Sequence, residues 1–119
     1  EGMIYQGGYS SEAQFQRAVI ELAQWYGWRV HAERPARTAT GWRTAIQGDP
    51  GFFDLVLARH CRRDQPGFGR CIIAELKATR GTVSAAQREW FRVLTQCRGL
   101  ECYIWRPHDW PAIVELLRR

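Results

Sequence analysis

Two apolar segments that each carry one acidic residue constrain this chain more than any other feature. Residues 52–57 read FFDLVL around Asp54, and residues 72–76 read IIAEL around Glu75. Both segments are typical of core strands, yet an unpaired carboxylate in such surroundings would cost several kcal/mol of desolvation. We therefore expect the two carboxylates to lie close together with a cation between them.

The only lysine of the chain follows the second acidic residue. All other basic residues are arginines, and the exception is Lys77. Side chains alternate along a strand, so Glu75 and Lys77 are expected on the same face. A compact ammonium can sit beside a metal-bound water or a scissile phosphate, where a guanidinium would pair with the acids instead. The alternative is that a single lysine in an arginine-rich chain has this position by chance.

Length and charge limit the class of protein. At 119 residues the chain is expected to form one domain, residues 1–119, with a core that needs no disulfide or metal. The net charge of +5 favours a polyanionic partner such as nucleic acid. A GC-rich genome would also enrich arginine, so composition alone does not decide between these explanations.

The termini and the cysteines bear on the compartment. The only methionine is Met3, which favours a native start there, with Glu1 and Gly2 as a remnant and no signal peptide. No apolar run approaches the roughly 20 residues of a membrane span, so no membrane partner is expected. The four cysteines lack zinc-finger spacing, which favours reduced thiols in the cytoplasm of a bacterial or phage-infected cell. A zinc site built from them with His60 or His108 is the alternative.

Helix and strand patterns alternate along the chain in the order α-β-β-β-α-β-α. Ser-x-x-Gln capping boxes begin helices at Ser11 and Ser84, and Gly27 and Gly99 end them. The expected elements are a helix over 11–27, strands over 28–33, 52–57 and 72–76, a helix over 84–99, a strand over 101–106 and a helix from Asp109. Residues 34–51 are expected to form a polar loop without regular structure. This order predicts an α/β domain with a mixed β-sheet flanked by helices.

Two loops concentrate arginine. The loop over 59–70 joins the two acidic strands as a hairpin, and it is the strongest candidate for contacts to a nucleic-acid backbone. In the loop over 34–51, the arginines and Trp42 could contact phosphates and a base, or they could be solvated. The arginines expected to contact DNA are Arg37, Arg43, Arg59, Arg62, Arg63, Arg70 and Arg80.

Two helical side chains are candidates for the same site as the acids. Glu12 and Gln16 lie one turn apart at the start of the first helix, although a solvated Glu12 would also suit the helix dipole. Gln87 lies in the first turn of the second helix and is expected to face the strand that leads to Lys77.

The order of these residues resembles the VRR-NUC nucleases of the PD-(D/E)XK superfamily. The resemblance rests on Glu12 with Gln16, Gly51-x-x-Asp54, Glu75-x-Lys77 and Gln87-x-x-Trp90, with the runs over 80–90 and 105–110. It extends from Ser11 to Trp110 and implies a restriction-endonuclease-like core. One position departs from the pattern: the residue before the first acid, often Pro in the superfamily, is Phe53, which bears on strand geometry more than on chemistry.

The resemblance implies a site for Mg²⁺ or Mn²⁺. Asp54, Glu75 and the backbone carbonyl of Leu76 would hold the ion, and Glu12 would reach it directly or through water. These hard oxygen ligands suit Mg²⁺ or Mn²⁺ rather than zinc.

The same resemblance implies the remaining catalytic roles. Lys77 would orient or deprotonate the attacking water and stabilise the transition state. Gln87 would hold the Lys77 amine or the water, and the products would be a 5′-phosphate and a 3′-hydroxyl. His60 and His108 are not expected to take part.

The substrate implied by the resemblance is branched DNA. Small members with a single domain look like Holliday junction resolvases that act as homodimers, whereas larger relatives cut flaps. A four-way junction and a homodimer are therefore expected, with a flap or nicking repair nuclease as the alternative. Two further alternatives are a nuclease module of a helicase or restriction complex and an arginine-rich DNA-binding protein without catalysis.

Overall fold

The computed structural model describes residues 5, 11–33, 36–38, 41–43 and 47–119, and for 36–38 and 41–43 it describes the strands only. The elements are α1 (Glu12–Trp25), β1 (Arg29–Ala32), β2 (Ala36–Thr38), β3 (Gly41–Arg43), β4 (Leu55–Arg59), β5 (Arg70–Leu76), α2 (Ala85–Leu94), β6 (Leu100–Trp105), the 3-10 helix η1 (Pro107–Asp109) and α3 (Trp110–Arg118). The predicted α-β-β-β-α-β-α order holds for the three α-helices and for β1, β4, β5 and β6.

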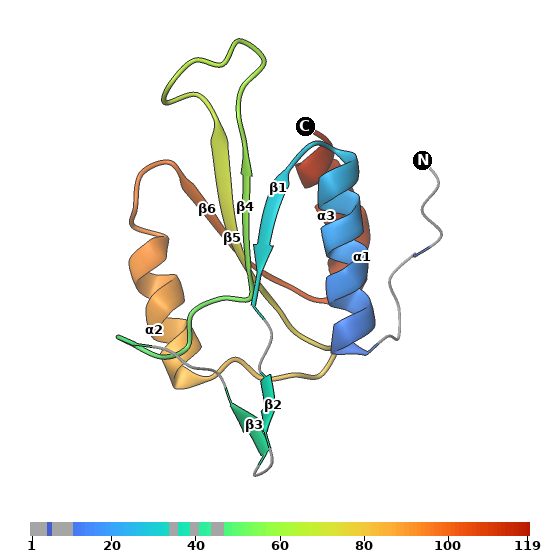
Figure 1. Cartoon of the computed structure of the whole chain (residues 1–119), viewed down its shortest axis with the longest axis vertical. Helices are drawn as coiled ribbons and strands as arrows, with labels where there is room; N and C mark the ends of the chain where they lie inside the picture. The colour runs from blue at the N-terminus through green and yellow to red at the C-terminus, as the bar shows by residue number, and fades with distance from the viewer. Residues whose placement is uncertain (1–4, 6–10, 34–35, 39–40, 44–46) are drawn as a thin grey trace.

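Four strands form the central sheet, in the order β1-β4-β5-β6 (Figure 1). The pairs β1–β4 and β4–β5 are antiparallel. The pair β5–β6 is parallel, and α2 lies between these two strands in the chain as the crossover that a parallel pair needs. Helices α1 and α3 lie on one side of the sheet and α2 on the other. The structure is therefore α/β, with a mixed sheet flanked by helices.

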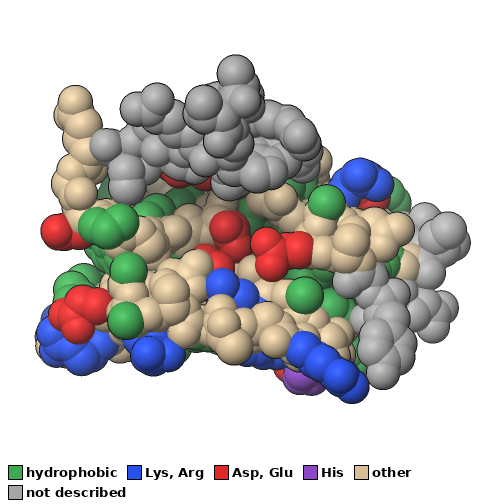
Figure 2. All heavy atoms as spheres, turned by 90° about the horizontal axis from the view of Figure 1, so that it is seen from below, with side chains coloured by type: hydrophobic (Ala, Val, Ile, Leu, Met, Phe, Trp, Pro, Cys, Tyr) green, Lys and Arg blue, Asp and Glu red, His purple; other side chains and the backbone are tan. Residues whose placement is uncertain are grey.

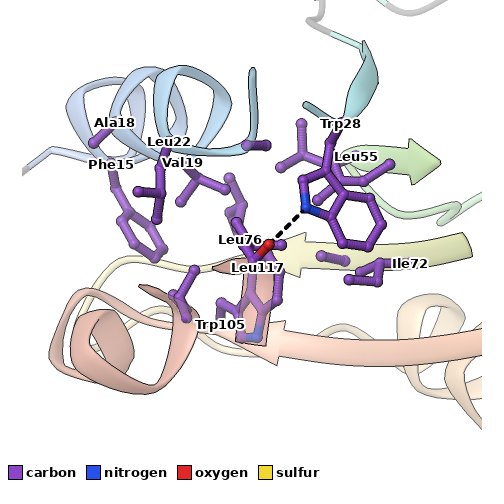
Figure 3. Close-up of a cluster of buried hydrophobic side chains, with 14 of the residues drawn as sticks. Phe15, Ala18, Val19, Leu22, Trp28, Leu55, Ile72, Leu76, Trp105 and Leu117 are labelled. Carbon is purple, nitrogen blue, oxygen red and sulfur yellow. Dashed lines mark hydrogen bonds between the residues drawn. The ribbon is translucent and has the colours of Figure 1, made fainter. Parts of the chain in front are cut away.

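The larger core lies between the sheet and the pair α1 and α3 (Figure 3). Phe15 and Leu57 are completely buried there, and each such side chain contributes about 1.5–3 kcal/mol by leaving water. The buried Trp28 donates from Nε1 to the carbonyl of Leu117 at 2.9 Å, which ties the turn after α1 to the end of α3. A smaller core of Phe53, Ile73 and Leu94 packs α2 against the opposite face.

Helix α1 begins as predicted at the capping box of Ser11 and Gln14. Ser11 Oγ accepts from Gln14 N at 3.1 Å, and the Gln14 side chain accepts from Ser11 N at 3.0 Å. On its inner face Ala18 is buried, whereas Trp25 in the last turn is 62% exposed. No helix in the described part of the chain has the length and apolar content needed to cross a bilayer.

Two expectations about strands were wrong. Residues 34–51 are not wholly irregular, because β2 and β3 pair as an antiparallel hairpin within them. Polarity argues against a buried strand, but two strands can satisfy each other's backbone groups without an apolar face. In addition, Asp54 lies just before β4 rather than inside it, so the first acid is placed by the chain entering the sheet.

Candidate active site

The two acids meet at one end of the central sheet. The antiparallel register pairs Leu55 with Ala74, so Asp54 comes next to Glu75 on the adjoining strand. Asp54 Oδ2 accepts a hydrogen bond from the backbone N–H of Leu76 at 3.0 Å. The two carboxyl groups lie within hydrogen-bonding reach of each other. We call this end of the sheet, with Asp54, Glu75, Lys77 and Gln87, the acid end.

Glu75 is the only buried charged residue among those the structure describes, at 3% exposure. Its Oε2 accepts a hydrogen bond from Gln87 Nε2 at 2.7 Å and lies 3.4 Å from Lys77 Nζ. Its Oε1 is buried and has no hydrogen-bond partner within the described residues. A hydrogen bond from Oε1 to Asp54 would need a proton on one of the two carboxyl groups. With both groups ionised, Oε1 therefore has no donor.

The pKa values of the two acids reflect this arrangement. Burial, and then the nearby charge of Asp54, raise the pKa of Glu75 from 4.5 to about 7, while Lys77 opposes the shift. Burial also raises the pKa of Asp54, and the hydrogen bond from the Leu76 N–H opposes it. A bound cation would relieve both causes, since it restores favourable interactions to the ionised forms.

Gln87 connects helix α2 to Glu75. Its side-chain Oε1 accepts from the backbone N–H of Ser84 at 3.0 Å, as the capping box of α2 requires. The other end of the same amide is thereby directed at Glu75. The prediction assigned Gln87 to the Lys77 amine or to a water, whereas the structure places it on the Glu75 carboxylate.

A tight turn before Asp54 packs against α2. Gly51 has φ +90°, and a Cβ there would lie 2.6 Å from the Cβ of Ala86. Trp90 Nε1 donates to the carbonyl of Pro50 at 3.0 Å and its ring packs edge-on against Phe52. Glycine is therefore required at Gly51 by both conformation and close approach, and the contact fixes the entry of the chain into Asp54.

Hydrogen bonds from Arg106 hold the turn after Lys77. Arg106 Nη1 donates to the carbonyls of Ala78 at 2.8 Å and of Gly81 at 2.7 Å. The Arg106 backbone N–H in turn donates to Asp109 Oδ2 at 2.8 Å. The sequence reasoning noted the Trp-Arg-Pro-x-Asp-Trp run but assigned no role to Arg106, because its partners lie about 25 residues earlier in the chain.

Other acids lie around the pair. Glu12 is exposed in the first turn of α1. Within the described residues no group of three or more His, Cys, Asp or Glu side chains is arranged to hold a metal. Glu33, which sequence reasoning missed, raises the pKa of Asp54 by its charge. Its backbone N–H donates to the Asp54 carbonyl at 3.1 Å, a proximity that only the β1–β4 register determines.

The acid pair fits a hard divalent cation. One unpartnered carboxylate oxygen is buried beside a second carboxylate, and this donor set suits Mg²⁺ or Mn²⁺. Viewed from below, acidic and basic side chains lie side by side in the middle of this face of the molecule (Figure 2).

The arginines expected to contact DNA fall into three groups. Arg59 and Arg70 lie at the far end of β4 and β5 and are held by contacts within the protein. The side chains of Arg62, Arg63 and Arg80 are exposed. The side chains of Arg37, Trp42 and Arg43 lie outside the described part of the structure. The whole of Arg34 also lies outside it.

His60 and His108 pair with acids other than Asp54 and Glu75. His60 is exposed and pairs with Asp64 at 2.6 Å, and His108 is exposed and lies 3.5 Å from Asp109. The four cysteines are unpaired thiols, and they form no metal-binding group with either histidine.

Comparison of the chain with protein-family models, with curated proteins and with solved structures found no match. The functional assignment therefore depends on the residues of the acid end and on the motif resemblance alone.

Proposed function

We propose that this protein is a metal-dependent endonuclease that hydrolyses phosphodiester bonds in branched DNA. The observation that carries the proposal is the unpartnered Oε1 of Glu75, buried beside Asp54 with Lys77 and Gln87 around it. A purely structural carboxylate pair would be expected to have its oxygens satisfied, because leaving one unpaired costs free energy of folding.

Each residue of the acid end has a distinct task in this reaction. Asp54, Glu75 and the Leu76 carbonyl would hold Mg²⁺ or Mn²⁺, which would lower the pKa of a water and offset charge on the scissile phosphate. Lys77, whose Nζ lies 3.4 Å from Glu75 Oε2, would orient that water and stabilise the negative charge that develops on the phosphate. Gln87 keeps the Glu75 carboxylate in place. The water oxygen would bond to phosphorus as the bond to the 3′-oxygen breaks. One water proton would pass to the solvent, and the leaving 3′-oxygen would take up a proton from the solvent to give the 3′-hydroxyl.

The substrate proposal is a four-way junction cut by a homodimer. The support is the motif resemblance, in which the single-domain members look like resolvases that act as homodimers. A flap, or a duplex in which the enzyme makes a nick, is the alternative substrate for the same chemistry, and Glu12 would act directly or through a water in either case.

The test is cleavage of a synthetic four-way junction, a flap and a plain duplex in Mg²⁺, Mn²⁺ and EDTA, with the mass measured by light scattering. We expect metal-dependent cutting of branched DNA, with symmetric nicks from a dimer on the junction. Asp54→Asn, Glu75→Gln and Lys77→Ala should each reduce the cleavage rate by at least about 10²-fold, with DNA affinity largely retained. Glu21→Gln, at an exposed acid on α1, is the matched control.

Cleavage within a few-fold of wild type in any of the three variants would show that the site is misassigned. A protein that binds the branched DNA in Mg²⁺ but leaves it uncut would instead be a DNA-binding module.

A further inference from the structure

A hollow surface lined by arginines lies at the end of the sheet opposite the acid end. It consists of two cavities of about 560 Å³ and 860 Å³ that share four lining residues, including Arg59 and Arg70. The first is also lined by Arg62, Arg118 and Arg119, and the second by Arg29 and Arg98. Among the residues that the structure describes, no Asp or Glu lines either cavity. We call these seven residues the arginine groove.

The floor of the arginine groove is rigid. The guanidinium carbons of Arg59 and Arg70 lie 4.5 Å and 4.9 Å from the ring centroid of the buried Trp28. Arg59 Nη1 also donates to the carbonyls of Tyr26 at 3.1 Å and Leu117 at 3.0 Å, at the ends of α1 and α3. Both cations are therefore held in place by the fold rather than free to make flexible contacts.

The rim of the groove carries the cations that can reach a ligand. Arg29, Arg62 and Arg98 are exposed and make no ion pair with any described residue. By contrast, Arg70 forms a two-bond pair with Glu101, and Arg118 pairs with Glu115. The excess of positive charge therefore lies at the rim and is available to an external anion.

An exposed aromatic ring lies beside these cations. Phe68, in the β4–β5 hairpin, lines the first cavity and is 70% exposed. Its exposed face is available to pack against a ligand that lies on the neighbouring cations. An aromatic ring next to several arginines is the combination with which proteins bind unpaired nucleic acid, stacking a base while guanidinium groups contact phosphates.

We propose that the arginine groove binds a single-stranded segment of nucleic acid, with phosphates on the rim arginines and a base on Phe68. It acts without a metal ion and apart from the acid end, about 17 Å away along β5 between Arg70 and Glu75. Because carboxylates repel phosphates, an anchor at this distance would hold a strand that the acid end alone attracts poorly.

The binding test uses fluorescence anisotropy in EDTA with a labelled 20-nucleotide single strand and the matching duplex, from 50 to 200 mM salt. The groove variant is Arg62→Gln with Arg98→Gln. The control removes two arginines outside the groove, Arg17→Gln with Arg92→Gln. We expect the groove variant to bind the single strand at least tenfold more weakly at 50 mM salt. Its plot of log affinity against log salt should be shallower by about 0.7 per lost phosphate contact, with less than threefold change in the control.

The stacking test separates the single strand from the duplex. Phe68→Ala should weaken binding of the single strand by about fivefold or more and leave the duplex within twofold of wild type. Trp25→Ala, which removes another exposed aromatic ring, should change neither. Equal losses on both DNAs, or equal behaviour of the two double-arginine variants, would overturn the proposal. So would binding to phosphatidylserine vesicles with no binding to either DNA.

The two proposals fail separately. If the wild-type protein cleaves no DNA in Mn²⁺ but binds the single strand in EDTA as expected, the nuclease proposal is wrong and the proposal of a binding groove stands. Metal-dependent cleavage by a groove variant whose DNA affinity equals that of wild type would remove the groove and keep the nuclease.

Discussion

The two ends of the central sheet treat buried charge in opposite ways. At the acid end, Glu75 is almost fully buried and keeps one oxygen without a partner. At the other end, Arg59 and Arg70 are partly buried, but each guanidinium has backbone carbonyls or a carboxylate as partners and Trp28 as a stacking surface. One end of the sheet thus has a buried polar atom without a hydrogen-bond partner, whereas the charged groups at the other end have partners.

The contrast indicates which end reduces stability and which adds to it. An unpaired buried acceptor and two adjacent carboxylates lower the free energy of unfolding. Cations that cap carbonyls at helix C-terminal ends raise it. Proteins tolerate such a cost mainly at functional sites, where a ligand removes it. Substitutions at the two ends should therefore change stability with opposite signs.

The largest effect on stability is expected from Trp28→Ala. This change removes a ring that is 3% exposed, its hydrogen bond to Leu117, and the stacking surface of both arginines. We expect a loss of about 3–5 kcal/mol in the free energy of unfolding, measured in urea. Trp25→Ala, at a ring that is 62% exposed, should cost less than about 1 kcal/mol. Similar losses in both variants would contradict a structural role for the far end.

Substitution at the acid end should raise the free energy of unfolding rather than lower it, and the size of this effect should depend on pH. Burial raises the pKa of Glu75 to about 7 from 4.5, so the folded protein binds more protons than the unfolded chain between those values. Stability without metal therefore falls as the pH rises through this window, by on the order of 3 kcal/mol in total.

Glu75→Gln should remove that pH dependence. In EDTA, Glu75→Gln should be more stable than wild type at pH 8 and about as stable at pH 5. At pH 8, Mn²⁺ should raise the melting temperature of wild type but not that of Glu75→Gln. The measurement is urea unfolding at both pH values. A wild-type protein whose stability rises from pH 5 to pH 8, with the rise lost in Glu75→Gln, would contradict the raised pKa.

The smallest effect is expected from substitutions in the two capping boxes, which form a matched pair. Ser11→Ala and Ser84→Ala remove the same hydrogen bond from equivalent positions, and each should cost about 1 kcal/mol. Only the Ser84 hydroxyl accepts from the backbone N–H of Gln87, at 3.1 Å, and the Gln87 side-chain amide contacts Glu75. We therefore expect Ser84→Ala to slow cleavage by about threefold to tenfold while Ser11→Ala leaves the rate unchanged. Equal rates would show that the cap of α2 does not position Glu75.

Local patterns in the sequence predicted most of the central fold. The Ser-x-x-Gln pairs marked the starts of α1 and α2, because a capping box involves residues only three apart. Alternation along a strand placed Glu75 and Lys77 on one face for the same reason. The polar hairpin of β2 and β3 was missed, since its pairing does not depend on an apolar pattern.

The sequence by itself determined that two carboxylates and one ammonium lie close to the ends of neighbouring core strands, since side-chain alternation is a property of the local backbone. Only the tertiary structure decided that Gln87 contacts Glu75, that Glu33 lies beside Asp54, and that Arg59 and Arg70 hold the fold together. These contacts join residues far apart in the chain. Their geometry depends on strand register and on where each helix packs, which no short-range pattern specifies.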